Sequence, residues 1–340
     1  MRIRKLIISV AVTAGVLLLP GRSLQAEPQY IKKFGSVAPL ASPWGAQLNS
    51  VKSRIESESN GRVRIALFMD GKLGDEEAMV DDVVRGERLQ GGGFSAGALG
   101  EKLDIPLLSM TELPYLFRNV IEADAILDGV LYEPTQSALG EKGLVLAAWA
   151  ENGWRSFATT GGPATTPAEL AQYKMRAQNS SIHEQMYAAM GAQPVKLTTA
   201  QVLPSLESGI VNGFDNTPLF TRLWLGSVTH YTLTRHIYQA AGVVYSKKFM
   251  ERLPADLQTV VMGDPAAEAE RGRIAVRAEQ KKIRGQLSDE GVTVVKLSKD
   301  QVKVFRETTN VVHTQFIKEN PEMVDEYKLV KDALTAIRSK

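Results

Sequence analysis

The sequence predicts an α/β fold in which two lobes share several chain crossings. Short apolar runs alternate with longer amphipathic runs, a pattern typical of a parallel or mixed sheet with helices on its faces. The 314 residues after a hydrophobic leader are enough for two domains. Because no repeat or low-complexity linker separates two halves, we expect the chain to pass between the lobes more than once.

The first 26 residues have the layout of a secretory signal peptide. Arg2, Arg4 and Lys5 form a basic start, residues 6–19 carry no charge, and Ala26 offers a small residue for cleavage. The apolar run is shorter than the ~20 residues that a membrane-spanning helix needs. We therefore expect export to the periplasm, cleavage near Ala26 and a mature chain that does not span the membrane.

Charge and cysteine content narrow the function classes. Without its four leader arginines and lysines, the chain has 36 basic and 38 acidic residues, a net charge of −2. A nucleic-acid partner is not supported, because such binding needs a clustered basic surface. The chain has no cysteine, which excludes disulfides and thiolate metal sites.

The chain opens with four elements in alternation. They are a strand at 31–37, a helix at 44–57, a strand at 63–68 and a helix at 75–85. Leu48, Val51 and Ile55 follow helical spacing, and Asn60 and Gly61 predict the turn that follows.

Further helices and strands continue the α/β pattern. Helices are expected at 122–140, after Thr166 as a cap, at 181–190 and 201–208, over most of 254–288, and from 299 to the end. Strands are expected at 144–149, 157–160, 173–176, 210–214 and 292–297.

Residues 93–97 match the pentapeptide of a hydrolase nucleophile elbow, with Ser95 as the nucleophile. That motif needs a strand before the serine, and Gly91, Gly92 and Gly93 make a poor strand end. The four histidines, which could complete a triad, are His183, His230, His236 and His313. The alternative is a glycine-rich turn that lines a cleft, and we favour it over a secreted serine hydrolase.

Motifs for metals and cofactors are incomplete. His183 and Glu184 begin like a zinc-protease helix, but Tyr187 stands where the second histidine ligand is required. No phosphate loop or dinucleotide fingerprint is present. We expect no metal, no cofactor and no catalytic residues.

Two arginines, Arg155 and Arg176, lie beside short apolar strands rather than on charged helix faces. Ligands of open α/β sheets bind beyond the carboxyl ends of strands, and an arginine there can hold a carboxylate with two parallel hydrogen bonds. The alternative for each is a structural ion pair.

The chain resembles the substrate-binding proteins of tripartite ATP-independent periplasmic (TRAP) transporters, of the DctP type. The resemblance rests on five blocks in order: residues 59–63 with 71–75, 112–117, 143–155, 173–176, and 190–194 with 206–213. It implies a two-lobed periplasmic binding protein fold, with the lobes joined by crossing strands and a long helix. Expected boundaries are 27–150 with a segment near 239–265 for lobe I, and 151–238 with helices from about 270–340 for lobe II.

The resemblance also implies a ligand site. Arg176 would pair with the ligand carboxylate, Asn216 would hydrogen-bond the ligand, and Arg155 would lie in or near the cleft. The other expected site residues are Trp149 and Trp154 as pocket walls, Phe94, Ser95 and Ala96 in a lobe I loop, and Trp44 near a ligand-facing loop.

This chain departs from the family where residues 201–206 lack the usual tyrosine. That change puts the common C4-dicarboxylate ligand in doubt and makes a less polar or bulkier acid plausible. We expect a solute-binding protein that captures a small organic carboxylate by lobe closure and delivers it to TRAP membrane permease subunits. A periplasmic ligand-sensing subunit of a signalling system is the alternative.

Overall fold

A computed structural model of the chain describes residues 28–339. A single mixed sheet of nine strands runs through the molecule in the order β2-β1-β3-β8-β4-β7-β5-β6, and β9 pairs with β8. The strands are β1 (Tyr30–Gly35), β2 (Val63–Phe68), β3 (Gly91–Ser95), β4 (Leu144–Thr159), β5 (Lys174–Ala177), β6 (Gln193–Lys196), β7 (Gly213–Asn216), β8 (His230–Ser246) and β9 (Thr293–Lys296). The predicted signal peptide lies outside the described residues.

Two long strands, β4 and β8, hold the molecule together. They pair antiparallel along nearly their whole length, from Leu144 opposite Ser246 to Thr159 opposite His230. At one end β8 pairs with β3, and at the other end β4 pairs with β7. We call the part built around β1–β3 lobe I and the part built around β5–β7 lobe II. The predicted crossing strands are thus β4 and β8, while the predicted residue boundaries of the lobes stay a prediction.

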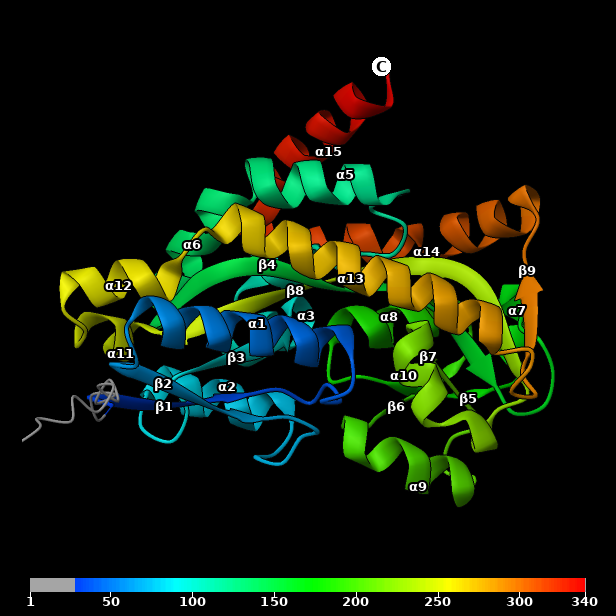
Figure 1. Ribbon diagram of the computed structural model, residues 1–340. Coiled ribbons are helices and arrows are strands. Elements are labelled where there is room, and N and C mark those ends of the chain that lie inside the picture. Colours follow the sequence, from blue (N-terminus) through cyan, green and yellow to red (C-terminus); the bar gives the residue numbers. More distant parts are fainter. Residues whose placement is uncertain (1–27, 340) are drawn as a thin grey trace, which may run out of the picture.

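Helices cover both faces of the sheet (Figure 1). They are α1 (Pro43–Glu58), α2 (Glu76–Arg85), α3 (Ala96–Leu103), α4 (Pro106–Met110), α5 (Val120–Ala125), α6 (Tyr132–Glu141), α7 (Pro167–Leu170), α8 (Ser181–Ala189), α9 (Val202–Glu207), α10 (Pro218–Leu223), α11 (Lys247–Glu251), α12 (Ala255–Met262), α13 (Pro265–Gln286), α14 (Lys299–Glu319) and α15 (Val324–Arg338). Neighbouring residues of β4, such as Leu146 and Ala147, belong to two different apolar cores. Because successive side chains of a strand point to opposite faces, one core lies on each side of the sheet.

The predicted long helix is α13, which packs on β4 and lies across the front of β4 and β8 at the junction of the lobes (Figure 1). Its Arg277 forms ion pairs with Asp124, at 2.6 Å, and with Glu151 of β4, at 2.8 Å. The C-terminal helices connect the lobes as well, since α14 packs on α8 and Arg338 of α15 pairs with Glu122 of α5 at 2.7 Å. The two lobes therefore share much more than a flexible tether.

Local signals explain where the early elements begin. Ser42 caps α1 by accepting a hydrogen bond from the Gly45 amide, with Pro43 in the first turn. Asp75 caps α2 by accepting from the Ala78 amide at 2.9 Å. Asn60 and Gly61 both have positive φ, so the predicted turn between α1 and β2 is confirmed.

The expectation of a glycine-rich turn at residues 93–97 is wrong, because Gly91–Ser95 is strand β3, paired with β1 and β8, and α3 begins directly after it at Ala96. Glycine is required here by close packing, since a Cβ on Gly93 would overlap the Trp44 ring. A glycine-rich strand is easily missed from sequence, because glycine disfavours strands in general.

Three further elements differ from the expectation. The two strands predicted at 144–149 and 157–160 are one continuous strand, β4, interrupted only by bulges. The helix predicted at 122–140 is divided by a π-helical segment at Ile126–Val130. Strand β8 was not predicted, because Ala240, Ala241 and Gly242 at its centre are poor strand formers.

Candidate ligand-binding site

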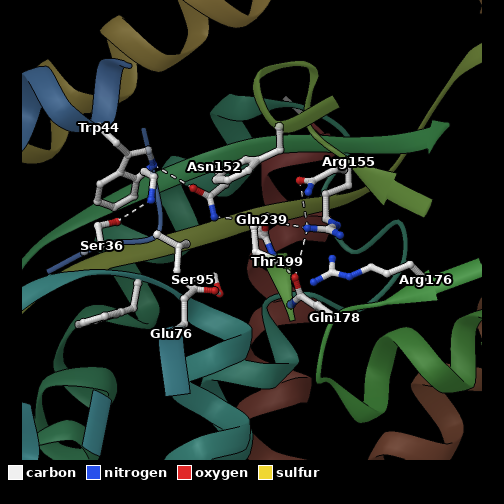
Figure 2. Close-up of a pocket in the computed structure, with 16 residues that line it drawn as sticks. Ser36, Trp44, Glu76, Ser95, Asn152, Arg155, Arg176, Gln178, Thr199 and Gln239 are labelled. Atoms are coloured by element: carbon white, nitrogen blue, oxygen red, sulfur yellow. Dashed lines mark hydrogen bonds between the residues drawn. The ribbon is translucent and has the colours of Figure 1, made fainter. Parts of the chain in front are cut away.

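A cavity lies between the lobes, against the middle of β4 and β8. Its lining residues are Ser36, Val37, Ala38, Trp44, Glu76, Gly93, Phe94, Ser95, Asn152, Arg155, Arg176, Gln178, Thr199, Asn216, Phe220 and Gln239. Figure 2 shows Arg176 reaching from one side toward Gln178 and Arg155, with Glu76 and Ser95 on the other side. The cavity measures only about 40 Å³, room for about three water molecules, so a larger solute would require the lobes to separate.

Arg176 is a buried cation without an acidic partner. It lies in β5, only 4% exposed, and its Nε atom donates to the carbonyl of Leu197 at 2.9 Å. No carboxylate within residues 28–339 forms an ion pair with it. Burial and the nearby charge of Arg155 lower the pKa of Arg176 to about 10. An anion that entered the cavity would relieve this uncompensated charge.

Arg155, by contrast, is fully engaged. Its Nε donates to the Asp215 carboxylate at 2.5 Å and a terminal nitrogen donates to the Asp215 carbonyl at 2.6 Å. The other terminal nitrogen donates to Gln239 at 2.9 Å, Gln178 at 3.2 Å and Asn216 at 3.4 Å. Its role combines the two alternatives from sequence: Arg155 lines the cavity, but its charge is balanced by a structural ion pair.

Glu76 and Ser95 form the lobe I wall. The Glu76 carboxylate accepts hydrogen bonds from the Ser95 amide at 2.7 Å and from the Ser95 hydroxyl at 3.0 Å. Burial and the Glu112 carboxylate raise the pKa of Glu76. Ser95 also caps α3 by accepting from the Ala98 amide. The wall therefore presents a carboxylate that can accept hydrogen bonds from solute hydroxyl groups.

A series of hydrogen-bonded polar side chains forms the floor of the interlobe cavity. The Trp44 indole N–H donates to Asn152 at 2.8 Å, and the Asn152 amide donates to Gln239 at 3.2 Å. Gln239 in turn donates to Gln178 at 2.9 Å. These bonds fix the amide orientations, so the floor offers donors and acceptors in fixed positions.

Asn216 ends β7 beside Arg155. Its side-chain oxygen accepts from the Thr217 amide at 2.9 Å, which leaves its amide nitrogen without a protein partner among residues 28–339. That nitrogen can donate to an oxygen of a bound solute. Phe94 from β3 and Phe220 from α10 add apolar surface from the two lobes.

Three carboxylates of lobe I meet the start of helix α8 in lobe II. Glu77 accepts from Asn179, and Glu101 accepts from the Ser181 amide at 2.8 Å and its hydroxyl at 2.7 Å. Glu112, fully buried, lies 3.0 Å from Nε2 of His183. Negative charge is favoured at a helix N-terminus, so these contacts stabilise the approach of the two lobes.

Six of the nine expected site residues line the cavity: Arg176, Asn216, Arg155, Phe94, Ser95 and Trp44. Ala96 and Trp149 are instead buried in an apolar core, and Trp154 lines a different cavity, between β4 and α13. Sequence reasoning missed Glu76, Asn152, Gln178 and Gln239. The first three adjoin or lie inside the sequence blocks that carry the resemblance, whereas nothing in the sequence marked Gln239.

The arrangement around Ser95 differs from that of a hydrolase. A strand and a helix do flank Ser95, but its hydroxyl donates to Glu76 rather than to an imidazole. His183 approaches Glu112 and Asp215, and His236 approaches Asp215 at 3.2 Å. Within residues 28–339, no group of three or more histidine, aspartate or glutamate side chains is arranged so that it could hold a metal ion. No helix in this part of the chain is long and apolar enough to cross a membrane.

The sequence profile of the bacterial extracellular solute-binding proteins, family 7 (DctP), matches residues 34–320. The chain belongs to this family. The membership confirms the resemblance that the sequence blocks predicted, and the rival hydrolase and sensor interpretations gain no support from it.

Named relatives within family 7 are similar over most of their length. The chain is 26% identical to the 2,3-diketo-L-gulonate-binding periplasmic protein YiaO of Escherichia coli, over 82% of this chain and 84% of that protein. It is also 26% identical to the C4-dicarboxylate-binding periplasmic protein DctP of Rhodobacter capsulatus, over 85% of this chain and 87% of that protein.

Solved structures share the two-lobed fold. The sugar acid binding protein DctPAm of Advenella mimigardefordensis, in complex with galactonate, superposes with a TM-score of 0.85 at 22% identity, covering 91% of this chain and 99% of that one. A TRAP solute-binding protein of Chromohalobacter salexigens with bound D-glucuronate superposes with a TM-score of 0.82 at 24% identity, covering 90% of this chain and 99% of that one. The predicted fold class is confirmed.

Proposed function

We propose that this family 7 protein captures a small hydroxylated carboxylate, of the sugar acid class, between its lobes in the periplasm. It then delivers the solute to the membrane permease subunits of a TRAP transporter. The observation that carries the proposal is Arg176, a buried guanidinium with no acidic partner that lines the interlobe cavity. Its planar fork suits a carboxylate.

The polar lining favours a solute with several hydroxyl groups. Glu76 offers an acceptor and Asn216 offers a donor, around a space that Phe94 and Phe220 line with apolar surface. Relatives named for 2,3-diketo-L-gulonate, galactonate and D-glucuronate bind molecules of this kind. The less polar acid suggested by the missing tyrosine at 201–206 fits this lining less well.

Capture would proceed by closure of the lobes. The carboxylate pairs with Arg176 and Asn216 of lobe II, and lobe I then brings Glu76, Ser95 and Trp44 over the solute. Closure excludes water, and the lower local dielectric strengthens the ion pair. Only contacts made in the closed state can drive this change, so hydroxyl contacts to lobe I would supply the driving force. Binding without chemical conversion needs no catalytic residue.

A thermal-shift and calorimetry panel tests the proposal. D-Glucuronate, D-galacturonate and galactonate are compared with D-glucose, which lacks the carboxylate, and with succinate, which lacks hydroxyl groups. We expect at least one sugar acid to raise Tm, since a solute that binds only the folded state stabilises it, and D-glucose to have no effect. A response to D-glucose equal to that of the acids would contradict the role of Arg176, and a response to succinate alone would contradict the sugar acid class.

A further inference from the structure

A second cavity is lined by residues of β4, β8 and α13. Figure 1 shows α13 lying across these two strands at the junction of the lobes. It measures about 260 Å³ and includes Trp154, Ser156 and Arg235 from the strands and Lys281 and Arg284 from the helix. The interlobe site uses Arg155 of the same strand. Because Trp154 and Arg155 are neighbours in β4 and neighbouring side chains point to opposite faces, the two cavities lie on opposite sides of the sheet.

The lining carries an excess of positive charge. Four cations line the cavity against one carboxylate, Glu151. Glu151 is already satisfied by Arg277 and by the Tyr238 hydroxyl. The remaining cations, Arg235, Lys281 and Arg284, form no ion pair with any carboxylate within residues 28–339. Such a concentration of one sign around a concave surface attracts ions of the opposite sign.

Arg235, Lys281 and Arg284 are all exposed to solvent, but contacts with the fold restrict Arg235. Arg235 has φ of 47°, a left-handed conformation that costs free energy for a residue with a side chain. Its guanidinium lies 4.6 Å from the centre of the Trp154 ring, which restricts its motion. Partial burial and the charge of Arg284 lower the pKa of Arg235. The Trp154 indole N–H is buried without a hydrogen-bond partner, so an unused donor adjoins the cations.

We propose that this cavity is a second binding site, for a multivalent phosphate-type oxyanion held by Arg235, Lys281 and Arg284. Guanidinium groups bind such oxyanions with paired hydrogen bonds, and two or more negative charges match the three unbalanced cations. The phosphate group could belong to a soluble ion or to a lipid headgroup. This inference does not depend on the proposed function of the interlobe site.

Occupation of the second site should influence the first. Gly153 has a positive φ of 95°, and register shifts on either side of it mark a bend in β4. An anion that connects β8 to α13 across this bend would change the free energy of lobe closure. By thermodynamic linkage the solute must then change anion affinity by the same factor.

Isothermal titration of the mature protein with inorganic pyrophosphate at low ionic strength tests the site. We expect binding to be at least tenfold weaker in the double variant Arg235→Gln/Arg284→Gln. Lys282→Gln is the matched control, since Lys282 lies on the same helix, is exposed and does not line the cavity. Arg176→Lys is a second control, which separates this site from the interlobe cavity; both controls should retain binding.

Sedimentation with phosphatidylglycerol vesicles, compared with phosphatidylcholine vesicles, identifies the source of the phosphate group. Vesicle binding that the double variant loses would support a headgroup, and pyrophosphate binding without vesicle binding would support a soluble ion. The proposal is overturned if wild type binds neither pyrophosphate nor vesicles, or if the double variant binds as wild type does. Loss of pyrophosphate binding in Arg176→Lys, with retention in the double variant, would equally refute it.

Discussion

Arg155 and Arg176 line the same cavity and are both buried, with 1% and 4% of their surfaces exposed, yet their surroundings are opposite. Arg155 is held by the Asp215 carboxylate and by three amide oxygens. Arg176 has one backbone acceptor and no carboxylate. One arginine is satisfied within the protein, and the other is left for a partner from outside.

The difference shows how a protein can build a charged site without losing its fold. A buried charge is tolerated when it is paired, so the Arg155–Asp215 pair can serve as a fixed wall. The unpaired Arg176 costs stability in the empty protein, and the incoming carboxylate offsets that cost. Four predictions probe this contrast.

The largest effect is expected from Arg155→Met. The variant leaves the Asp215 carboxylate buried without its cation, and breaking a buried pair in this way costs about 3–5 kcal/mol. The free energy of unfolding from urea denaturation measures the loss. A variant as stable as wild type would show that Tyr187 and His236, which also contact Asp215, suffice to hold the carboxylate.

Arg176 variants should change binding rather than folding. We expect Arg176→Lys to weaken solute binding roughly 100-fold, about 2.7 kcal/mol, because lysine cannot form the two parallel hydrogen bonds. Arg176→Met should leave the empty protein as stable as wild type or more so, since it removes an unpaired buried charge. Calorimetry gives the affinity and denaturation the stability; unchanged affinity in Arg176→Lys would remove this residue from the site.

Asn216→Ala tests a residue that accepts a hydrogen bond from Arg155 and lines the same cavity as Arg176. Loss of its amide would leave a buried solute oxygen unpaired, which costs about 1–3 kcal/mol. Calorimetry with the solute identified by the panel measures the change. Equal dissociation constants for variant and wild type would show that the Asn216 amide does not contact the solute.

The smallest expected effect is on the pH dependence of stability, which the two histidines beside Asp215, His183 and His236, should influence in opposite directions. Despite burial, the Asp215 and Glu112 carboxylates raise the pKa of His183, whereas burial lowers that of His236. The stability contributed by charged His183 is present below its ordinary pKa and is lost as pH rises through the raised value. His183→Gln should therefore reduce Tm more at pH 5.5 than at pH 8.5.

His236→Gln is the matched control with the opposite trend. Because the pKa of His236 is lowered in the folded state, its contribution is present above its ordinary pKa and is lost as pH falls through the lowered value. This variant should reduce Tm more at pH 8.5 than at pH 5.5. Equal effects of either substitution at both pH values would contradict the assigned charge states.

Sequence patterns predicted the α/β class and most helices, because helical spacing and caps such as Thr166 are local signals. They failed where long-range packing decides the structure. The strand at Gly91–Ser95 forms by pairing with β1 and β8, and Gly93 is a glycine there because a Cβ would overlap the Trp44 ring. Strand β8 lies between β3 and β4, and this burial outweighs the poor propensity of its central residues.

The site residues were also predicted only in part, because some are marked by local sequence patterns and others are brought to the site by long-range strand pairing. Arg176 lies inside one of the sequence blocks that carry the resemblance, and Asn216 lies three residues after another, at the end of β7. Gln239 becomes a site residue only because β8 pairs with β4 and brings it beside Arg155. Trp154 was expected at the solute, but the alternation of side chains along β4 turns it to the far face, which no single-sequence pattern could decide across the bulges at Glu151 and Arg155.

The acidic residues that meet the start of α8 have a consequence for transport. The closed conformation is stabilised by contacts that need no bound solute, namely those of Glu77, Glu101 and Glu112 with the start of α8. A fraction of the solute-free protein can therefore adopt the closed conformation. The apparent affinity depends on the fraction of molecules in the competent state, so these carboxylates tune how tightly cargo is retained. The same attraction would slow the release of the bound solute.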